Sequence, residues 1–203
     1  MRFVNIPQNE VSFMTILCDY QIAGYCQGDK PLVSPFDENL LNGVSLDIRV
    51  GYSALIEDLP RSDFEAVIDP SSPLSRYKPN FAEVDLSPFT VEEPYLVEPN
   101  EFLLVASLEV FNMPNNIAGE FRLRSTFARF GFDQSLAVWL EPEWTDSVLT
   151  LELKNNCRYH RLPLFPEMRL GQVIFHEVKP PLKKKYSTLG HYNGDRKVQA
   201  AKV

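Results

Sequence analysis

The sequence predicts a mainly β protein that folds as one antiparallel sandwich or barrel. Sixteen prolines and nine glycines divide the 203 residues at short intervals, and the runs between them are rich in Val, Leu, Ile and Phe. Short apolar runs separated by turn residues are typical of this fold class. Because 44% of the residues are hydrophobic, the chain is also long enough to bury one core. We therefore expect one β-rich domain over residues 1–180 and a basic C-terminal segment over 181–203.

One helix is expected near the start, because apolar residues recur at helical spacing over 12–24 and Gly24 can end a helix there. Runs rich in β-forming residues predict the strands. These runs are 44–56, 65–69, 102–111, 117–124, 135–140, 148–155 and 170–178. Pro-Asn pairs at 99–100 and 114–115 predict turns. The segment 70–94 has little periodicity, and we expect an irregular loop there with one short strand at most.

Charge and cysteine content exclude several classes of function. The net charge of −7 argues against a protein that binds nucleic acid, since phosphate contacts need a basic surface. Cys18, Cys26 and Cys157 form no C-x-x-C pair, which favours free thiols in a reducing compartment. The H-x-E and P-C-x-x-C elements with which zinc-dependent deaminases hold the metal are also missing from the sequence. No zinc and no other protein-bound metal is therefore expected.

Two further expectations concern location and the C-terminal segment. No apolar run approaches the roughly 18 residues needed to span a membrane, so we expect no membrane partner and a soluble, cytoplasmic protein. From Lys183 onwards there are six Lys or Arg and one acid, Asp195, so this segment is +5 and the remainder −12. Such a segment is either a solvated terminus or a mobile lid that contacts a small polyanion. Without further evidence than its charge, the solvated terminus is favoured.

A strand that ends in hydroxyl residues and turns into a short helix predicts an anion site. Ser125 is expected to cap the helix, with Thr126 beside it, and Gly131 to end it. Free backbone N–H groups, the two hydroxyls and the Arg124 guanidinium together suit phosphate. Arg129 lies one helical turn after Ser125 and shares its face. On these residues alone, an ordinary capped turn with surface arginines is the more frequent alternative.

Two acidic positions follow this motif. Strict alternation over 148–155 places three leucines on one strand face and Glu152 on the other. Glu152 is then either a solvated strand residue or, if a neighbouring subunit covers that face, a desolvated carboxylate with the raised pKa of a general base. Glu141 and Glu143 flank Pro142 in an expected turn, where exposed acids are common.

Taken in order, these segments resemble the dCTP deaminase family of the dCTP deaminase and dUTPase superfamily, over most of the chain. The similar segments are 17–22 (an N-terminal helix), 33–37 (I-x-P-F-D), 44–51 (S-x-D-x-R-x-G), 124–131 (G-R-S-S-L-A-R-L-G), 137–144 (T-A-x-x-I-D-P-G-W), 151–155 (L-E-L-x-N), 166–172 (P-G-M-x-I-G-Q) and 190–194 (G-K-Y-Q-G, a C-terminal lid). The resemblance implies a distorted jelly-roll, β-barrel-like subunit of the dUTPase type, assembled as a homotrimer with active sites between subunits. It implies hydrolysis of dCTP to dUTP and ammonia, with Mg²⁺ bound through the nucleotide triphosphate.

The resemblance also assigns roles to single residues. Glu152 would be the general base, Ser125 would orient the attacking water, and Arg129 would support the catalytic centre. Arg124 and the two hydroxyls would hold phosphates, and the Ala137 backbone would read the cytosine edge. The implied nucleotide-binding residues are Arg124, Ser125, Thr126, Ala137, Glu141, Tyr186, His191 and Asp195.

Two other functions stay open beside the deaminase. Relatives that hydrolyse only dUTP normally lack a glutamate at position 152 and activate water with an aspartate where this chain has Glu141, one methylene longer. A dUTP or dCTP pyrophosphatase, or a bifunctional enzyme, is therefore the second hypothesis. The third is a catalytically silent member that binds nucleotide or a protein partner, because Leu123, Glu143, His191 and Asp195 replace the glycine, glycine, lysine and glutamine usual in the family. The same departures allow a 5-substituted dCTP or dCMP as substrate.

Overall fold

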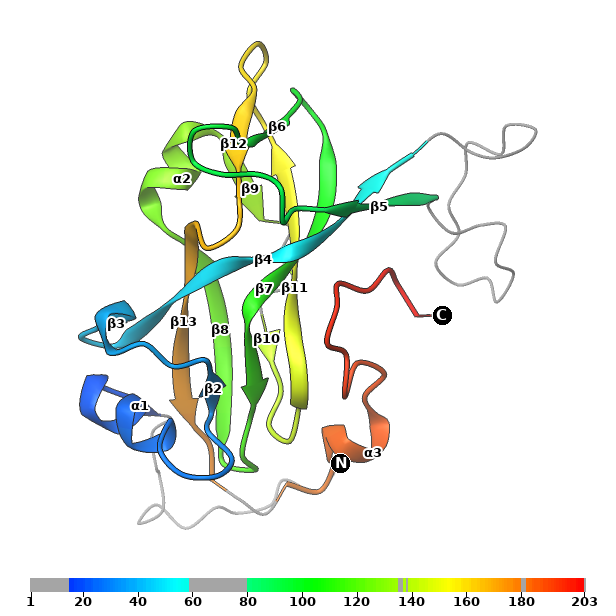
Figure 1. Ribbon diagram of the computed structural model, residues 1–203. Helices are drawn as coiled ribbons and strands as arrows, with labels where there is room; N and C mark the ends of the chain where they lie inside the picture. Colours follow the sequence, from blue (N-terminus) through cyan, green and yellow to red (C-terminus); the bar gives the residue numbers. More distant parts are fainter. Residues whose placement is uncertain (1–14, 59–79, 135–136, 138, 180–181, 203) are drawn as a thin grey trace, which may run out of the picture.

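The computed structural model describes residues 15–58, 80–134, 137, 139–179 and 182–202. Its elements, labelled in Figure 1, are β1 (Thr15–Ile16), α1 (Asp19–Tyr25), β2 (Val33–Ser34), a 3-10 turn η2 (Glu38–Leu40), β3 (Leu41–Asn42), β4 (Ser45–Glu57), β5 (Phe81–Asp85), β6 (Tyr95–Val97), β7 (Phe102–Asn112), β8 (Ile117–Leu123), α2 (Ser125–Phe130), β9 (Phe132–Gln134), β10 (Trp139–Leu140), β11 (Thr145–Asn155), β12 (Leu162–Leu164), β13 (Arg169–Glu177) and α3 (Tyr186–Leu189). None of the described helices is long and apolar enough to cross a membrane.

One curled antiparallel sheet forms most of the molecule. Its strands follow the order β10-β8-β13-β4-β7-β11-β9, and β6 and β12 form a separate pair. Strand β4 crosses the molecule diagonally (Figure 1): its first half pairs with β13 and its second half with β5 and β7. The sheet thereby folds over on itself and encloses the core, as in a partly closed barrel.

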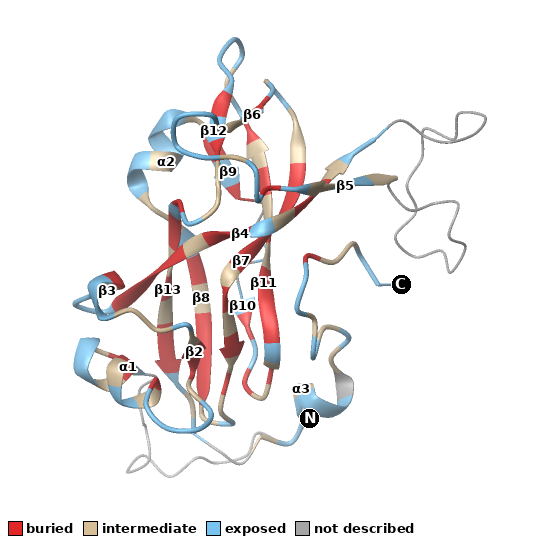
Figure 2. Ribbon diagram, in the orientation of Figure 1, coloured by how far each residue is buried: buried red, intermediate tan, exposed pale blue. Residues whose placement is uncertain are grey.

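The core fills the inside of this curl. Buried residues follow the central strands β4, β7, β8, β11 and β13 (Figure 2), and Phe111, Phe121 and Phe175 are completely enclosed among them. A second, smaller apolar cluster lies on the other face of β7 and β11. It joins Leu55, Leu104, Ala106 and Val148 to Val198 of the C-terminal segment.

The main strands agree with the sequence prediction. The expected strands 44–56, 102–111, 117–124, 148–155 and 170–178 are β4, β7, β8, β11 and β13, with ends that differ by at most three residues. The predicted strand 65–69 lies outside the described residues, as do 135, 136 and 138 of the predicted strand 135–140, of which the structure shows only β10. The loop predicted at 70–94 contains one described strand, β5, as expected.

The N-terminal helix was predicted too long. Residues 12–14 are not described, and Thr15–Ile16 form β1, which pairs with β13. Helix α1 begins after Cys18, whose backbone N–H donates to Gln21 Oε1 at 3.0 Å, and it continues one residue past Gly24. Backbone pairing with the sheet therefore overrides the helical spacing of the apolar residues before Cys18.

Helix α2 also differs from its prediction at one end. Gly131 ends it in the left-handed region, at φ 113°, where a glycine carries no Cβ penalty. The N-cap position is held by Arg124, without a side-chain capping bond, so Ser125 is the first helical residue and not the cap. The cap prediction was wrong because the extended backbone of β8 continues one residue further, with Arg124 N–H donating to Leu170 O.

Candidate active site

A cavity of about 520 Å³ lies between β7, β10, β11, α3 and the C-terminal segment. Its walls are mainly apolar and aromatic. The described residues that line it are Phe81, Phe102, Leu104, Ala137, Trp139, Leu140, Glu141, Trp144, Val148, Leu149, Thr150, Glu152, Tyr186, Tyr192, Asp195, Gln199 and Ala201. Such a concave apolar pocket with a few convergent polar groups is the usual form of a small-molecule site.

Glu152 is a half-buried acid of this cavity. It lies on β11 opposite Leu104 of β7, on the strand face that the alternation of leucines predicts. Burial removes water from its carboxylate and raises its pKa from 4.5 to about 7. The Gln134 side-chain amide donates a hydrogen bond to Glu152 Oε2 at 3.3 Å. At neutral pH the group is therefore divided between its acid and base forms, as proton transfer requires.

The predicted turn after β10 places two acids in different roles. Glu141 lines the cavity and is exposed. Glu143 adopts a left-handed backbone, at φ 67°, which explains why glycine suits this position. Its carboxylate accepts a hydrogen bond from Ser187 Oγ at 2.7 Å and lies 3.6 Å from Lys185 Nζ. Glu143 thus holds the start of the C-terminal segment against the turn.

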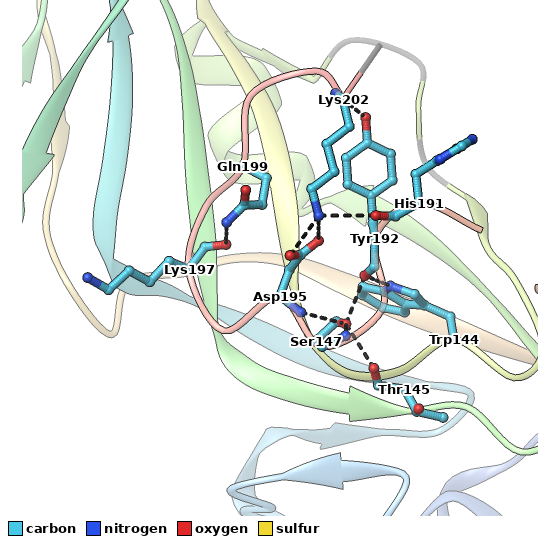
Figure 3. A network of polar contacts seen from close by, with 10 residues as sticks. Trp144, Thr145, Ser147, His191, Tyr192, Asp195, Lys197, Gln199 and Lys202 are labelled. Carbon is cyan, nitrogen blue, oxygen red and sulfur yellow. Dashed lines mark hydrogen bonds and ion pairs between the residues drawn. The ribbon is translucent and has the colours of Figure 1, made fainter. Parts of the chain in front are cut away.

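The C-terminal segment closes one side of the cavity through backbone contacts to β11 and the turn before it (Figure 3). The carbonyl of Tyr192 accepts hydrogen bonds from Trp144 Nε1 at 2.8 Å and from Ser147 Oγ at 2.9 Å. Ser147 Oγ in turn accepts the N–H groups of Gly194 and Asp195. Ser147 is fully buried, so it fixes this segment from within the fold.

Acidic groups outnumber basic ones in the cavity. Its described lining includes the carboxylates of Glu141, Glu152 and Asp195 but no Lys, Arg or His. Asp195 is neutralised from outside the lining, because Lys202 Nζ donates to both of its oxygens, at 2.7 and 2.5 Å. The same ammonium lies 5.1 Å from the centre of the Tyr192 ring. A polyanion bound here would therefore need positively charged groups from outside the described lining to balance its charge.

The predicted phosphate residues lie away from this cavity. Ser125, Thr126 and Arg129 are exposed on α2, which Figure 1 shows at the other end of the sheet from α3. Arg124 forms an ion pair with Asp47 at 3.2 Å. Within one chain, therefore, the α2 motif and Glu152 do not share a site.

Most of the predicted site residues outside the α2 motif lie close together in the structure. Ala137, Glu141, Tyr186, Asp195 and Glu152 line one cavity. The side chain of His191 does not, although its carbonyl accepts a hydrogen bond from Lys202 Nζ at 3.0 Å. The hypothesis that a neighbouring subunit covers the face of Glu152 stays a prediction, and within one chain the C-terminal segment already packs on that face through Val198.

Several residues of the site were missed by sequence reasoning: Gln134, Trp139, Ser147, Tyr192 and Lys202. Apart from Lys202, which contacts Asp195 seven residues away, their contacts join different elements of the fold. For two of them the sequence held a signal. Trp139 lies in 137–144 and Tyr192 in 190–194, two of the segments that resemble family motifs.

The fold and cavity define a mainly β, barrel-like protein, which confirms the predicted fold class. Residues 16–178 match the family model "dCTP deaminase-like", and the chain belongs to this family. It is 32% identical over 161 residues to "dCTP deaminase, dUMP-forming" of Hydrogenobaculum sp. (79% of this chain, 81% of that protein). It is 30% identical over 171 residues to a dCTP deaminase of Thermococcus sibiricus (84% and 90%).

A solved structure shows the same fold. The chain superposes on 2'-deoxycytidine 5'-triphosphate deaminase from Agrobacterium tumefaciens with a TM-score of 0.58 and 22% identity, over 80% of this chain. It spans 46% of that longer chain.

Proposed function

We propose that this chain hydrolyses dCTP to dUTP and ammonia without zinc, with Glu152 as the general base. The observation that carries the proposal is a half-buried glutamate, with its pKa raised to about 7, that lines a cavity of a dCTP deaminase-like fold. The names of the relatives support the substrate. A carboxylate with such a pKa both accepts and returns a proton near neutral pH.

The chemistry requires both protons of the attacking water to be moved, one after the other. Glu152 accepts a proton from water as the oxygen attacks C4 of cytosine, and delivers it to N3. A proton from the attacking oxygen then passes through the same carboxyl group to the amino nitrogen, the C4–N bond breaks, and ammonia leaves. One carboxylate that is shielded from bulk water can perform each transfer without exchanging its proton with solvent.

The triphosphate is proposed to be held across a subunit boundary. Arg124, Ser125 and Thr126 would bind phosphate, Ser125 would also orient the water, and Arg129 would support the catalytic centre. These residues do not line the cavity of their own chain, and that cavity's described lining is acidic. A homotrimer in which α2 of one subunit reaches the cavity of the next would supply the missing cations.

Other groups act on the nucleotide in this proposal. The Ala137 backbone would read the cytosine edge, and Tyr186, His191 and Asp195 would close over the substrate. Mg²⁺ would enter as part of the substrate, chelated by its phosphates. This chain, with a net charge of −7, is not proposed to bind nucleic acid or membranes, and a cytoplasmic location is proposed.

A bifunctional reaction is the second candidate. Formation of dUMP from dCTP, which the name of one relative states, requires loss of both ammonia and the two outer phosphates. Glu141 lines the same cavity as Glu152 and would activate a second water. Its side chain would replace the aspartate that dUTP-hydrolysing relatives use at this position.

The test is incubation of the purified protein with Mg²⁺ and dCTP, dUTP or dCMP, with ammonia and pyrophosphate measured separately. Ammonia from dCTP without pyrophosphate supports the deaminase. Both products support the bifunctional reaction, and pyrophosphate alone contradicts deamination. No product from any of the three would favour a catalytically silent member.

A further inference from the structure

Trp139 is the exposed aromatic residue of the cavity. Among the described aromatic residues that line it, Trp139 alone is exposed, at 47%. Trp144 is 7% exposed, stacks on Phe111 and donates its indole N–H to the Tyr192 carbonyl. The ring of Tyr192 faces the Lys202 ammonium. Trp139 is thus the lining aromatic residue with the most surface available to a ligand.

One face of this indole is already covered. The Trp139 and His176 rings stack with centroids 5.9 Å apart and an interplanar angle of 29°. Trp139 lies on β10 and His176 on β13, with β8 between them in the sheet. The opposite face and the edge of the indole therefore account for its exposure.

His176 is an unusual support for a tryptophan. It is 7% exposed, and both of its ring nitrogens are buried without a hydrogen-bond partner in the described part of the chain. Nε2 lies 3.7 Å from Glu120 Oε2, which is beyond hydrogen-bonding distance, and that carboxylate is already paired with Arg122. Buried polar atoms are normally satisfied. The imidazole therefore acts in this fold mainly through its ring face, which contacts Trp139.

We propose that Trp139 is the surface on which the cavity stacks the pyrimidine ring of its substrate, and that His176 is the positioning residue that holds the indole in place. This inference rests on the proposed function for the identity of the substrate. Ala137, two residues earlier, lines the same cavity. A backbone that reads the edge of a base and an indole that covers its face recognise two different surfaces of the same planar ring.

The physical consequence is a specific effect on substrate binding. Stacking of a base on an aromatic side chain changes affinity by roughly 5- to 150-fold. Stacking acts alike on the ground state and the transition state, because the ring stays planar except at C4. Uniform binding of this kind changes KM and leaves kcat nearly constant.

The kinetic test compares matched variants at each position. Trp139→Leu should raise KM for dCTP about tenfold and change kcat by less than about twofold, whereas Trp139→Phe should restore most of the affinity. His176→Leu should raise KM in the same direction, and His176→Phe, which keeps a ring behind the indole, should reverse it. Tyr159→Leu is the control, because Tyr159 is 73% exposed and does not line the cavity. An unchanged KM in both Leu variants overturns the inference.

A spectroscopic test follows the indole itself. The chain has two tryptophans, so labelling with 5-fluorotryptophan gives two ¹⁹F signals, and Trp139→Phe identifies the one from Trp139. In a Glu152→Gln background, which prevents turnover, dCTP should shift the Trp139 signal, and His176→Leu should broaden or divide that signal before nucleotide is added. A Trp139 signal that does not move at saturating dCTP overturns the inference even where the Leu variants fold poorly.

The two tests separate this inference from the proposed function. Ammonia release with an unmoved Trp139 signal would reject stacking and keep the deaminase. A Trp139 signal that moves with dCTP, dUTP or dCMP while the wild-type protein releases no ammonia would keep stacking and reject the deaminase. A protein that binds none of the three nucleotides would reject both.

Discussion

Gln134 Nε2 donates a hydrogen bond to Glu152 Oε2 over 3.3 Å, between neighbouring strands β9 and β11. The other amide atom, Gln134 Oε1, is buried without a partner among the described residues. The amide group therefore donates to the Glu152 carboxylate, while its carbonyl oxygen is left without a hydrogen bond among the described residues. A donor favours the charged form of a carboxylate and opposes the effect of burial.

The pKa of Glu152 predicts how activity depends on pH. Because a general base must be ionised, kcat/KM for dCTP should rise with pH through an apparent pKa near 7. The stability of the fold should depend on pH in the opposite direction. Between about 4.5 and 7 the folded state binds more protons at this group than the unfolded state, so its contribution to stability falls as pH rises through that window. A kcat/KM that is flat between pH 6 and 8 would contradict the assignment.

Loss of the Gln134 donor should raise the pKa of Glu152 further. Gln134→Leu is expected to move the rise in kcat/KM to higher pH, with the rate above the new pKa largely kept. Gln172→Leu is the control, because Gln172 bonds Ser45 and not the cavity. The measurement is the pH profile of all three proteins. An unshifted Gln134→Leu profile with a lower plateau would instead mean that the amide acts by orienting the carboxylate.

Glu143 combines a strained backbone with side-chain contacts that hold the C-terminal segment in place. Glu143→Gly removes the strain of a left-handed φ of 67°, worth about 1 kcal/mol, but also removes the contacts to Ser187 and Lys185. We expect faster proteolysis of the C-terminal segment and a higher KM, without a lower Tm. Glu167→Gly is the matched control, since its φ is 65° and its carboxylate accepts from the Tyr52 hydroxyl. Equal protease sensitivity in both variants would contradict this role.

The ion pair between Asp195 and Lys202 should matter most for a highly charged substrate. Lys202→Gln leaves the Asp195 carboxylate uncompensated at the cavity, and its repulsion should raise KM more for dCTP than for dCMP. Replacing Asp195 by Gln in the same background should restore KM, which a double-mutant cycle measures. The effect should weaken at high salt, because both groups are partly exposed. Equal effects on the two nucleotides would exclude charge as the cause.

The sequence predicts the parts of this molecule that local chemistry determines. Alternation of apolar residues places β11 and the orientation of Glu152 correctly, and Gly131 ends α2 where predicted. The predictions fail where distant segments compete for the same backbone. Thr15–Ile16 lie within the predicted helix 12–24 but pair with β13, and Ser125 is displaced from the cap position by the continuation of β8.

The candidate site shows the same limit. Glu152, Ala137 and Glu141 were identified from motif-like segments, whereas the contact between Gln134 and Glu152 depends on strand register and could not be read from spacing. The stack of Trp139 on His176 joins residues on two strands separated by a third. Neither contact can be predicted from the residues next to it in the sequence.

The most direct test of the central claim is Glu152→Gln, assayed for ammonia release from dCTP and, in parallel, for dCTP binding by calorimetry. Glutamine keeps the shape of the side chain but cannot take up the proton of water, so we expect ammonia release to fall by at least about a thousandfold while the affinity changes little. Glu141→Gln, made alongside, should keep ammonia release and reduce only any pyrophosphate formation. A Glu152→Gln protein that still releases ammonia at near the wild-type rate would show that another group is the base.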